Sequence, residues 1–194
     1  MSSLALILLL AAAPAAPGSA TEALQQRAAE VRAELPAKGE PITPPVRAKL
    51  EKLLTKTVDL RGMVKAALGP HWDKMTESQR RRMVGAFEKR FRSATTGDVE
   101  GYRSTELAYK PEERSGEFVK VPTEMVIQGE PTEVSYAMRK GPEGWRIEDI
   151  IVDGVSTVAN YRSSFARVIQ KDGVEALIAR LEKGPQGGGA KASR

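Results

Sequence analysis

The sequence changes from strand to helix within the stretch Asp153-Gly-Val-Ser-Thr-Val-Ala-Asn-Tyr-Arg-Ser-Ser-Phe165. A strand that carries Trp145 precedes it, and a second helical segment, Lys171-Asp-Gly-Val-Glu-Ala-Leu-Ile-Ala-Arg-Leu181, follows it. Asp153 and Gly154 are typical of a turn and a helix cap, because glycine gives the backbone the freedom that a tight turn needs. Beyond them, two helices are predicted by apolar residues at helical spacing: Val155, Val158, Phe165 and Ile169, and then Val174, Leu177, Ile178 and Leu181.

Short segments typical of β-strands lie upstream of this junction. They are separated by proline, glycine and charged residues, which favours an antiparallel sheet. The alternation is clearest where Val134, Tyr136 and Met138 share one face of a strand and small or polar residues occupy the other. Residues 140–144 are predicted to form a hairpin loop that pairs this strand with the next. The predicted strands cover residues 107–109, 117–121, 123–128, 133–139 and 145–152.

The N-terminal half is predicted to be helical. Apolar residues at helical spacing mark four helices, at residues 21–35, 43–54, 60–68 and 76–97, and a capping box at Thr76 and Gln79 begins the last of them. The predicted fold class is therefore α+β. N-terminal helices pack on a curved antiparallel sheet that two C-terminal helices close, in one domain over residues 21–183. The spacing does not distinguish a solid core from an apolar cavity between these layers.

Both ends of the chain differ in composition from this domain. Residues 1–20 contain no charged side chain and begin with an apolar block, followed by proline, glycine, serine and alanine, which is typical of a secretory signal peptide cleaved after Ala20. The block, residues 4–13, is shorter than the roughly 20 apolar residues that span a bilayer. An uncleaved N-terminal anchor is the alternative. Residues 184–194 are rich in glycine and are predicted to form a flexible tail.

The composition narrows the kinds of function. The 194 residues include no cysteine and a single histidine, His71, so the sequence offers no disulfide, no thiolate chemistry and no paired-histidine zinc site. The net charge of +5 indicates attraction to anionic surfaces. An exported protein rarely meets nucleic acid, and the cations of the 76–97 helix are mixed with Glu77 and Glu88. We interpret the basic residues as a solvated face, or as a surface for anionic headgroups or an acidic partner.

The strand-to-helix junction and its flanks resemble the MlaC family of periplasmic phospholipid-binding proteins, also called toluene-tolerance proteins. The resemblance extends to residues 59–91, through Leu68-Gly69, His71-Trp72 and Thr76 with Gln79-Arg80, and it is weak over residues 93–128. It is strongest over residues 133–181, where four segments occur in the order of the family: Gly144-Trp-Arg-Ile-Glu-Asp149, Asp153-Gly-Val-Ser156, Asn160-Tyr-Arg162 and Phe165.

This resemblance implies a soluble, monomeric carrier in the periplasm of a Gram-negative cell. Such a protein moves phospholipid between an outer-membrane lipoprotein and porin complex and an inner-membrane ABC transporter complex, both of the Mla type. It thereby maintains the lipid asymmetry of the outer membrane. It binds no nucleic acid and no metal, it needs no cofactor besides its phospholipid cargo, and it is not an enzyme.

On this interpretation, the lipid tails lie between the apolar face of the sheet and the helices. Arg162 falls on the same helical stripe as Val155, Val158 and Phe165, where an unpaired charge is costly. It is expected either to pair with Asp149 or Asp153, or to lie at the mouth of a cavity near a phosphate. The residues expected to contact lipid, each of which fits ordinary core packing equally well, are Val64, Leu68, Phe87, Val134, Tyr136, Met138, Trp145, Ile147, Val155, Val158 and Phe165.

Two other functions fit the same sequence. A ligand-free basic adaptor of a membrane transport complex would have a solid core in place of the cavity. An enzyme would use His71, or Glu148 with Asp149, in acid and base roles, but adjacent residues of a strand point to opposite faces and do not act together. We retain the adaptor as the alternative and assign no catalytic residue.

Overall fold

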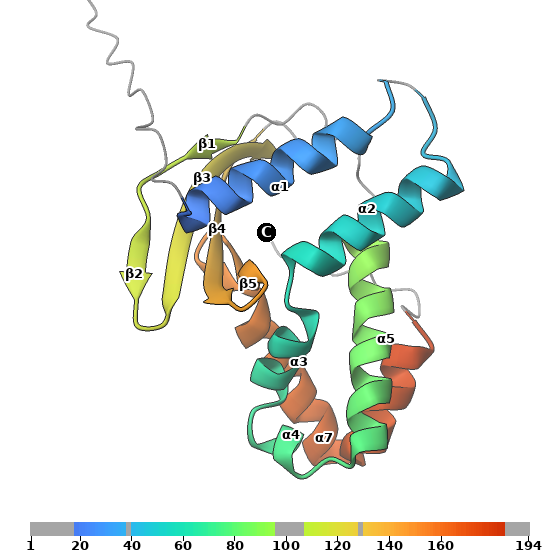
Figure 1. Cartoon of the computed structure of the whole chain (residues 1–194). Helices are drawn as coiled ribbons and strands as arrows, with labels where there is room; N and C mark the ends of the chain where they lie inside the picture. The colour runs from blue at the N-terminus through green and yellow to red at the C-terminus, as the bar shows by residue number, and fades with distance from the viewer. Residues whose placement is uncertain (1–17, 38–39, 96–106, 128–129, 185–194) are drawn as a thin grey trace, which may run out of the picture.

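The computed structural model in Figure 1 describes residues 18–37, 40–95, 107–127 and 130–184. Most of the expected signal peptide and of the expected flexible tail lies outside the described residues. The helices are α1 (Ala20–Glu34), α2 (Pro44–Thr57), α3 (Leu60–Leu68), α4 (Pro70–Asp73), α5 (Glu77–Thr95) and α7 (Thr157–Glu182). The strands are β1 (Ala108–Tyr109), β2 (Glu113–Ser115), β3 (Phe118–Ile127), β4 (Glu130–Gly141), β5 (Gly144–Val152) and β6 (Val155–Ser156).

Helix α3 lies in the core of the molecule. Asp59 caps its start by accepting a hydrogen bond from the backbone N–H of Gly62 at 3.0 Å. Gly69 ends it with a φ of 53°, in the region that favours glycine, and the chain turns there into α4. The predicted inward face of α3 is confirmed, since the buried residues are Leu60, Met63, Val64, Ala67 and Leu68.

Helix α5 begins at the predicted capping box. The Thr76 hydroxyl accepts a hydrogen bond from the Gln79 N–H at 3.2 Å, and the Gln79 side-chain oxygen accepts one from the Thr76 N–H at 2.9 Å. On the inner face of α5, the ring centroid of Phe87 lies 5.0 Å from that of Tyr161 and 6.5 Å from that of Phe165. These edge-to-face contacts join α5 to the first part of α7.

The sheet is antiparallel, with the strand order β1-β3-β4-β5-β6, and β2 pairs with β3 beyond the end of β1. The strands predicted at residues 117–121 and 123–128 are one continuous strand, β3, and β2 was not predicted. Pro122 is tolerated inside β3 because its carbonyl faces Lys110, whose N–H donates to it at 2.9 Å. On that edge β1 has ended and β2 has not begun, so the missing N–H of proline breaks no ladder.

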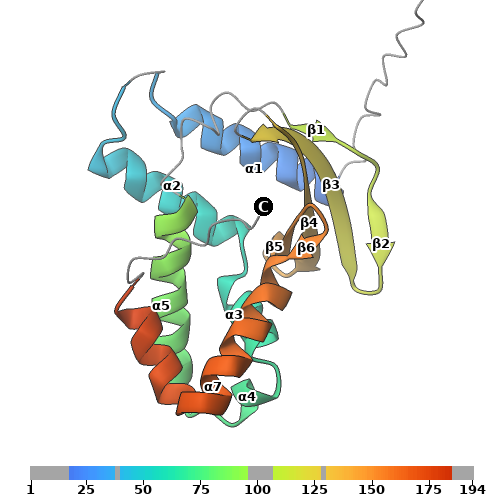
Figure 2. The ribbon, with the colours of Figure 1, turned by 180° about the vertical axis from the view of Figure 1, so that it is seen from behind.

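Figures 1 and 2 show how the layers are arranged. Helix α1 crosses one end of β3 and β4 and contacts both strands, while α3 and α5 pack against α7 below the sheet. The N-terminal helices therefore lie against a curved antiparallel sheet, and the C-terminal helix closes the molecule. This arrangement confirms the predicted α+β fold class.

The two predicted C-terminal helices are the two arms of α7, which bends at Gly173, where φ is 83° and ψ is 171° (Figure 2). The second arm is held to α5 by Arg82, whose guanidinium lies 2.9 Å from both Glu175 and Glu182. Neither α7 nor any other described helix is long and apolar enough to cross a membrane.

Candidate functional site

The residues predicted to contact lipid converge, with one exception, on the inner face of the sheet and the helices that cover it. Tyr136 and Trp145 are half-buried. Apart from Val134, the converging residues belong to or pack against one apolar cluster. Their contact with lipid stays a prediction. The buried members are Val64, Leu68, Phe87, Val134, Met138, Ile147, Val158 and Phe165.

Val155 is the exception. Its side chain is 61% exposed and lies outside the apolar cluster, so the expected burial is wrong, and its contact with lipid stays a prediction. The helical spacing was applied too early in the chain, because α7 begins only at Thr157. Val155 instead belongs to β6, where it pairs with Val152 at the edge of the sheet.

Strand β5 contains an irregularity that sets which of its residues face inward. Ile147 lies opposite Met138 and Ile150 lies opposite Tyr136, with a register shift between them. The shift leaves Glu148 as the extra residue, so Ile150 faces the interior where simple alternation would have placed Asp149. Sequence reasoning missed Ile150. The signal in the sequence was Asp149, a charged residue at the position where alternation from Ile147 predicts an apolar one.

The inner face of the sheet becomes more open along β5. Ile147 is 3% exposed, Ile150 is half-buried and Val152 is 38% exposed. In the same cross-strand row as Val152, the fully buried hydroxyl of Thr123 donates a hydrogen bond to the carbonyl of Val134 at 2.7 Å. The row therefore contains no unpaired hydroxyl, and the face stays compatible with an apolar ligand from the core to its open end.

Helices α1 and α2 cover this region incompletely. Leu24 and Ala28 are the buried apolar residues in the middle of α1, and Leu50 is the only residue of α2 that is buried. Helical spacing predicts that Val46, Leu50, Leu53 and Leu54 form one buried face of this helix, and that prediction is wrong for all but Leu50. An apolar ligand held between these helices and the sheet would cover the apolar side chains that the protein itself leaves partly exposed. The half-buried apolar residues of the two helices are Val31, Val46, Leu53 and Leu54.

The start of α1 is fixed by polar contacts that the sequence did not indicate. The indole N–H of Trp145 donates to the carbonyl of Gly18 at 2.8 Å, and the N–H of Thr21 donates to the Glu112 carboxylate at 2.7 Å. Burial alone would raise the pKa of Glu112, but hydrogen bonds from Thr21 and Ser19 to the carboxylate lower it below its ordinary value. One end of α1 is thus anchored to both β5 and the segment before β2.

Arg162 does not make the ion pair with Asp149 or Asp153 that was one of the two positions expected for it. It is exposed at the edge of the buried stripe of α7. Its Nε and Nη2 atoms donate to the carbonyl of Ala66, at 3.2 and 3.0 Å. Arg162 therefore satisfies a carbonyl near the C-terminal end of α3, which is a favourable site for a cation.

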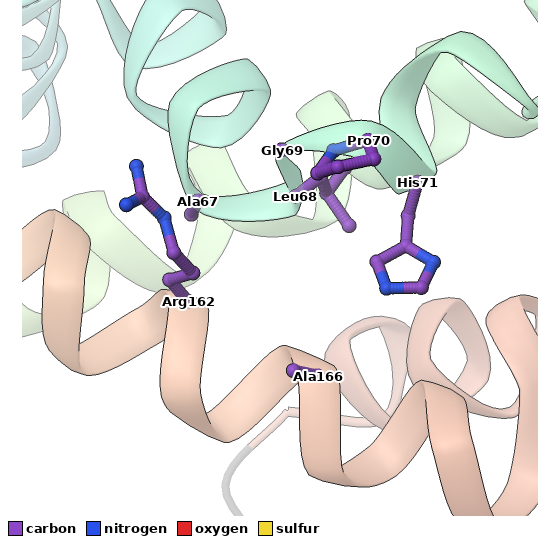
Figure 3. Close-up of a pocket in the computed structure, with 7 residues that line it drawn as sticks. All are labelled: Ala67, Leu68, Gly69, Pro70, His71, Arg162 and Ala166. Atoms are coloured by element: carbon purple, nitrogen blue, oxygen red, sulfur yellow. The ribbon is translucent and has the colours of Figure 1, made fainter.

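Arg162 also borders an open groove of about 390 Å³ between the end of α3, α4 and α7. Figure 3 shows Arg162 and His71 at opposite ends of it, with Ala166 between them on α7. We call it the α3–α7 groove. The residues that line it are Ala67, Leu68, Gly69, Pro70, His71, Arg162 and Ala166.

The carboxylates considered for acid and base roles serve separate structural partners. Glu148 lies 2.9 Å from the Arg139 Nε, and burial raises the pKa of Glu148. Asp149 accepts hydrogen bonds from the hydroxyl of Ser156 and from the N–H of Val158 at 3.0 Å, where α7 begins. Among the residues that the structure describes, no group of three or more His, Asp or Glu is placed to hold a metal ion.

Comparisons with known proteins agree with the fold and the sequence pattern. The phospholipid-binding protein from Ralstonia solanacearum, solved in complex with a phospholipid, matches this structure with a TM-score of 0.69 and 23% sequence identity. The match covers 87% of this chain and 96% of that one, so the two share a fold. The sequence model described as MlaC protein matches residues 22–183, which is most of the chain. The chain therefore belongs to the MlaC family.

Proposed function

We propose that the protein is a periplasmic phospholipid carrier, exported with a cleaved signal peptide. The main support is the inner face of the sheet, which stays apolar from the core to Val152 and lies under helices whose own apolar residues are only half-buried. The Ralstonia protein with the same fold holds a phospholipid, which supports the same class of cargo here.

The physical need for such a carrier is large. At about 0.8 kcal/mol for each methylene removed from water, two acyl tails of roughly thirty methylenes meet a barrier of about 20 kcal/mol when they cross water alone. A protein that shields the tails and leaves the headgroup hydrated lowers this barrier without a covalent step. The proposed activity therefore assigns no catalytic residue.

The proposed route runs between an outer-membrane complex and an inner-membrane ABC transporter complex of the Mla type, with the protein acting as a monomer. Membership of the MlaC family supports this route. The net charge of +5 also supports it, because both membranes and acidic partner surfaces attract a basic carrier. In this role the protein maintains the lipid asymmetry of the outer membrane.

Native mass spectrometry of protein purified from the periplasm without detergent tests the proposal. The expected result is a stoichiometric adduct that denaturation releases as a phospholipid. Incubation with phospholipid vesicles should load protein that has first been stripped of lipid.

A protein that is empty after purification and stays empty after incubation with vesicles would contradict the carrier function. The ligand-free basic adaptor would then be the better account, since it requires the same surface charge and a core that side chains fill.

A further inference from the structure

We infer that the α3–α7 groove is a docking site for an acidic segment of a partner protein, which inserts an apolar side chain between α3, α4 and α7. The inference rests on the groove and its charges, and it stands whether or not the interior of the protein holds lipid.

The first observation is where the excess charge of the chain lies. Residues 60–72 and 157–171, the two segments that include the residues lining the groove, contain five Lys and Arg and no Asp or Glu. The whole chain has 30 Lys and Arg against 25 Asp and Glu, so its net charge of +5 equals the charge of these two segments. The five cations are Arg61, Lys65, Arg162, Arg167 and Lys171.

The second observation is that these cations are not neutralised within the described part of the chain. Arg61 stacks over the ring of Trp72 at 5.2 Å and Arg162 binds the carbonyl of Ala66, but neither forms an ion pair with a described carboxylate. Lys65 and Arg167 are exposed. By contrast, Arg80, Arg81 and Arg82 of α5 all lie within 4 Å of glutamates. The basic residues of these two segments therefore lack the glutamate partners that the arginines of α5 have.

The third observation is the position of the basic residues along α3 and α7 relative to the residues that line the groove. Arg61 and Lys65 lie one turn apart on α3, and Gly69, which directly follows the end of that helix, lines the groove. On α7, Arg162 and Ala166 have the same interval, and both line it. The floor of the groove is apolar, whereas its ends carry Arg162 and His71 (Figure 3).

These observations favour a protein segment over a membrane surface. A concave apolar floor of about 390 Å³ accepts an inserted side chain, which a flat layer of headgroups does not supply. Cations on these segments that pair with no described carboxylate complement carboxylates that flank such a side chain, and they raise the rate of association at low salt. The occupant is therefore an apolar side chain within an acidic stretch.

Site-specific photo-cross-linking in the cells that produce the protein tests this assignment. A photoreactive phenylalanine analogue replaces Ser163, which is exposed on α7 between Arg162 and Ala166 and whose hydroxyl bonds only to a carbonyl of its own helix. The same analogue at Ala29, exposed on α1, is the control. The expected product at Ser163 is one protein segment, identified by peptide sequencing, that is acidic and carries an apolar residue at the adduct.

Charge reversal provides the second measurement. Lys65→Glu with Arg167→Glu should lower the cross-linked yield about tenfold or more, because both charges are exposed on the helices that flank the groove and would attract an acidic segment. Lys52→Glu with Lys89→Glu changes the net charge equally at exposed sites on α2 and α5, and it should change the yield no more than about twofold. Lipid retention, measured on the same variants by native mass spectrometry, reports the carrier function separately.

Three outcomes would overturn the inference: a lipid adduct at Ser163, a yield at Ser163 no greater than at Ala29, or equal yields from the two charge-reversed pairs. A wild-type protein that holds no lipid but still gives the cross-link would contradict the carrier function and leave the docking site standing.

Discussion

The indole N–H of Trp145 donates a hydrogen bond to the backbone carbonyl of Gly18 at 2.8 Å, across 127 positions of the sequence. Ser19 caps α1 by accepting from the N–H of Glu22 at 3.1 Å, and Ala20 is fully buried. Residues 18–20, assigned from the sequence to a removed segment, are thus part of the fold.

A chain that begins at Gly18 is expected to be more stable than one that begins at Thr21. The shorter chain loses the Ser19 cap, worth about 1 kcal/mol, together with the acceptor for Trp145 and the burial of Ala20. Thermal unfolding of the two recombinant chains measures the difference. In cells, the intact mass of the exported protein should show an N-terminus at or before Gly18, and a mature chain that starts at Thr21 with full stability would contradict this expectation.

Ile150→Glu is expected to abolish lipid loading, whereas Ile151→Glu is not. Ile150 lies opposite Tyr136 on the inner face, and Ile151 lies opposite Ser135 on the other face. Both isoleucines are half-buried, so the same substitution at neighbouring positions is a matched pair. A charge on the lipid-facing side would be desolvated by the tails, which costs several kcal/mol. Native mass spectrometry measures bound lipid per folded protein, and equal loading of both variants would place the lipid elsewhere.

Asp149→Ala is expected to lower the free energy of unfolding by about 2 kcal/mol. The carboxylate accepts hydrogen bonds from Ser156, Val158 and Ile150, and so joins β5 to the start of α7. Hydrogen bonds to a charged group contribute roughly 1.5–3 kcal/mol. Urea denaturation checks the change, with the exposed Glu143→Ala as the control. A loss no larger than that of the control would show that the joint holds by packing alone.

The anchor of α1 is expected to weaken in acid. Hydrogen bonds outweigh the opposing effect of burial and lower the pKa of Glu112 in the folded protein below its ordinary value of 4.5. A carboxylate with a lowered folded pKa contributes stability above its unfolded pKa and loses it as the pH falls through the folded pKa. The difference in melting temperature between wild type and Glu112→Gln should therefore be present near pH 6 and shrink towards about pH 3. A difference that does not vary with pH would contradict the role of the charge.

Two glycines are expected to respond to alanine in opposite directions. Gly173 has a φ of 83°, so alanine is strained there and should destabilise the fold by about 1 kcal/mol or more. Gly85 lies within helix α5, is exposed, and has nothing within 4 Å of an added Cβ. Alanine at Gly85 should stabilise by up to about 1 kcal/mol. Thermal unfolding of both variants tests the pair, and a Gly173→Ala protein as stable as wild type would show that the bend in α7 does not need glycine.

Local pattern predicted much of the fold. The buried face of α3, the capping box of Thr76 and Gln79, and the hairpin between β4 and β5 were all expected, because each depends on residues a few positions apart. The apolar cluster was also largely expected, since periodicity identifies the inward side of an element once the element is recognised. Family motifs then linked these elements to a function that spacing alone does not indicate.

What the sequence by itself determined is therefore the identity of the elements, their apolar faces and the family. Only the tertiary structure decided that Ile150 replaces Asp149 on the inner face, that Val155 is exposed, and that Arg162 binds a carbonyl of α3 beside a groove. Each of these depends on contacts between different elements, either neighbouring strands such as β4 and β5 or distant segments such as α3 and α7. Such contacts are fixed by how whole elements pack and pair, and the spacing of residues within one element carries no information about them.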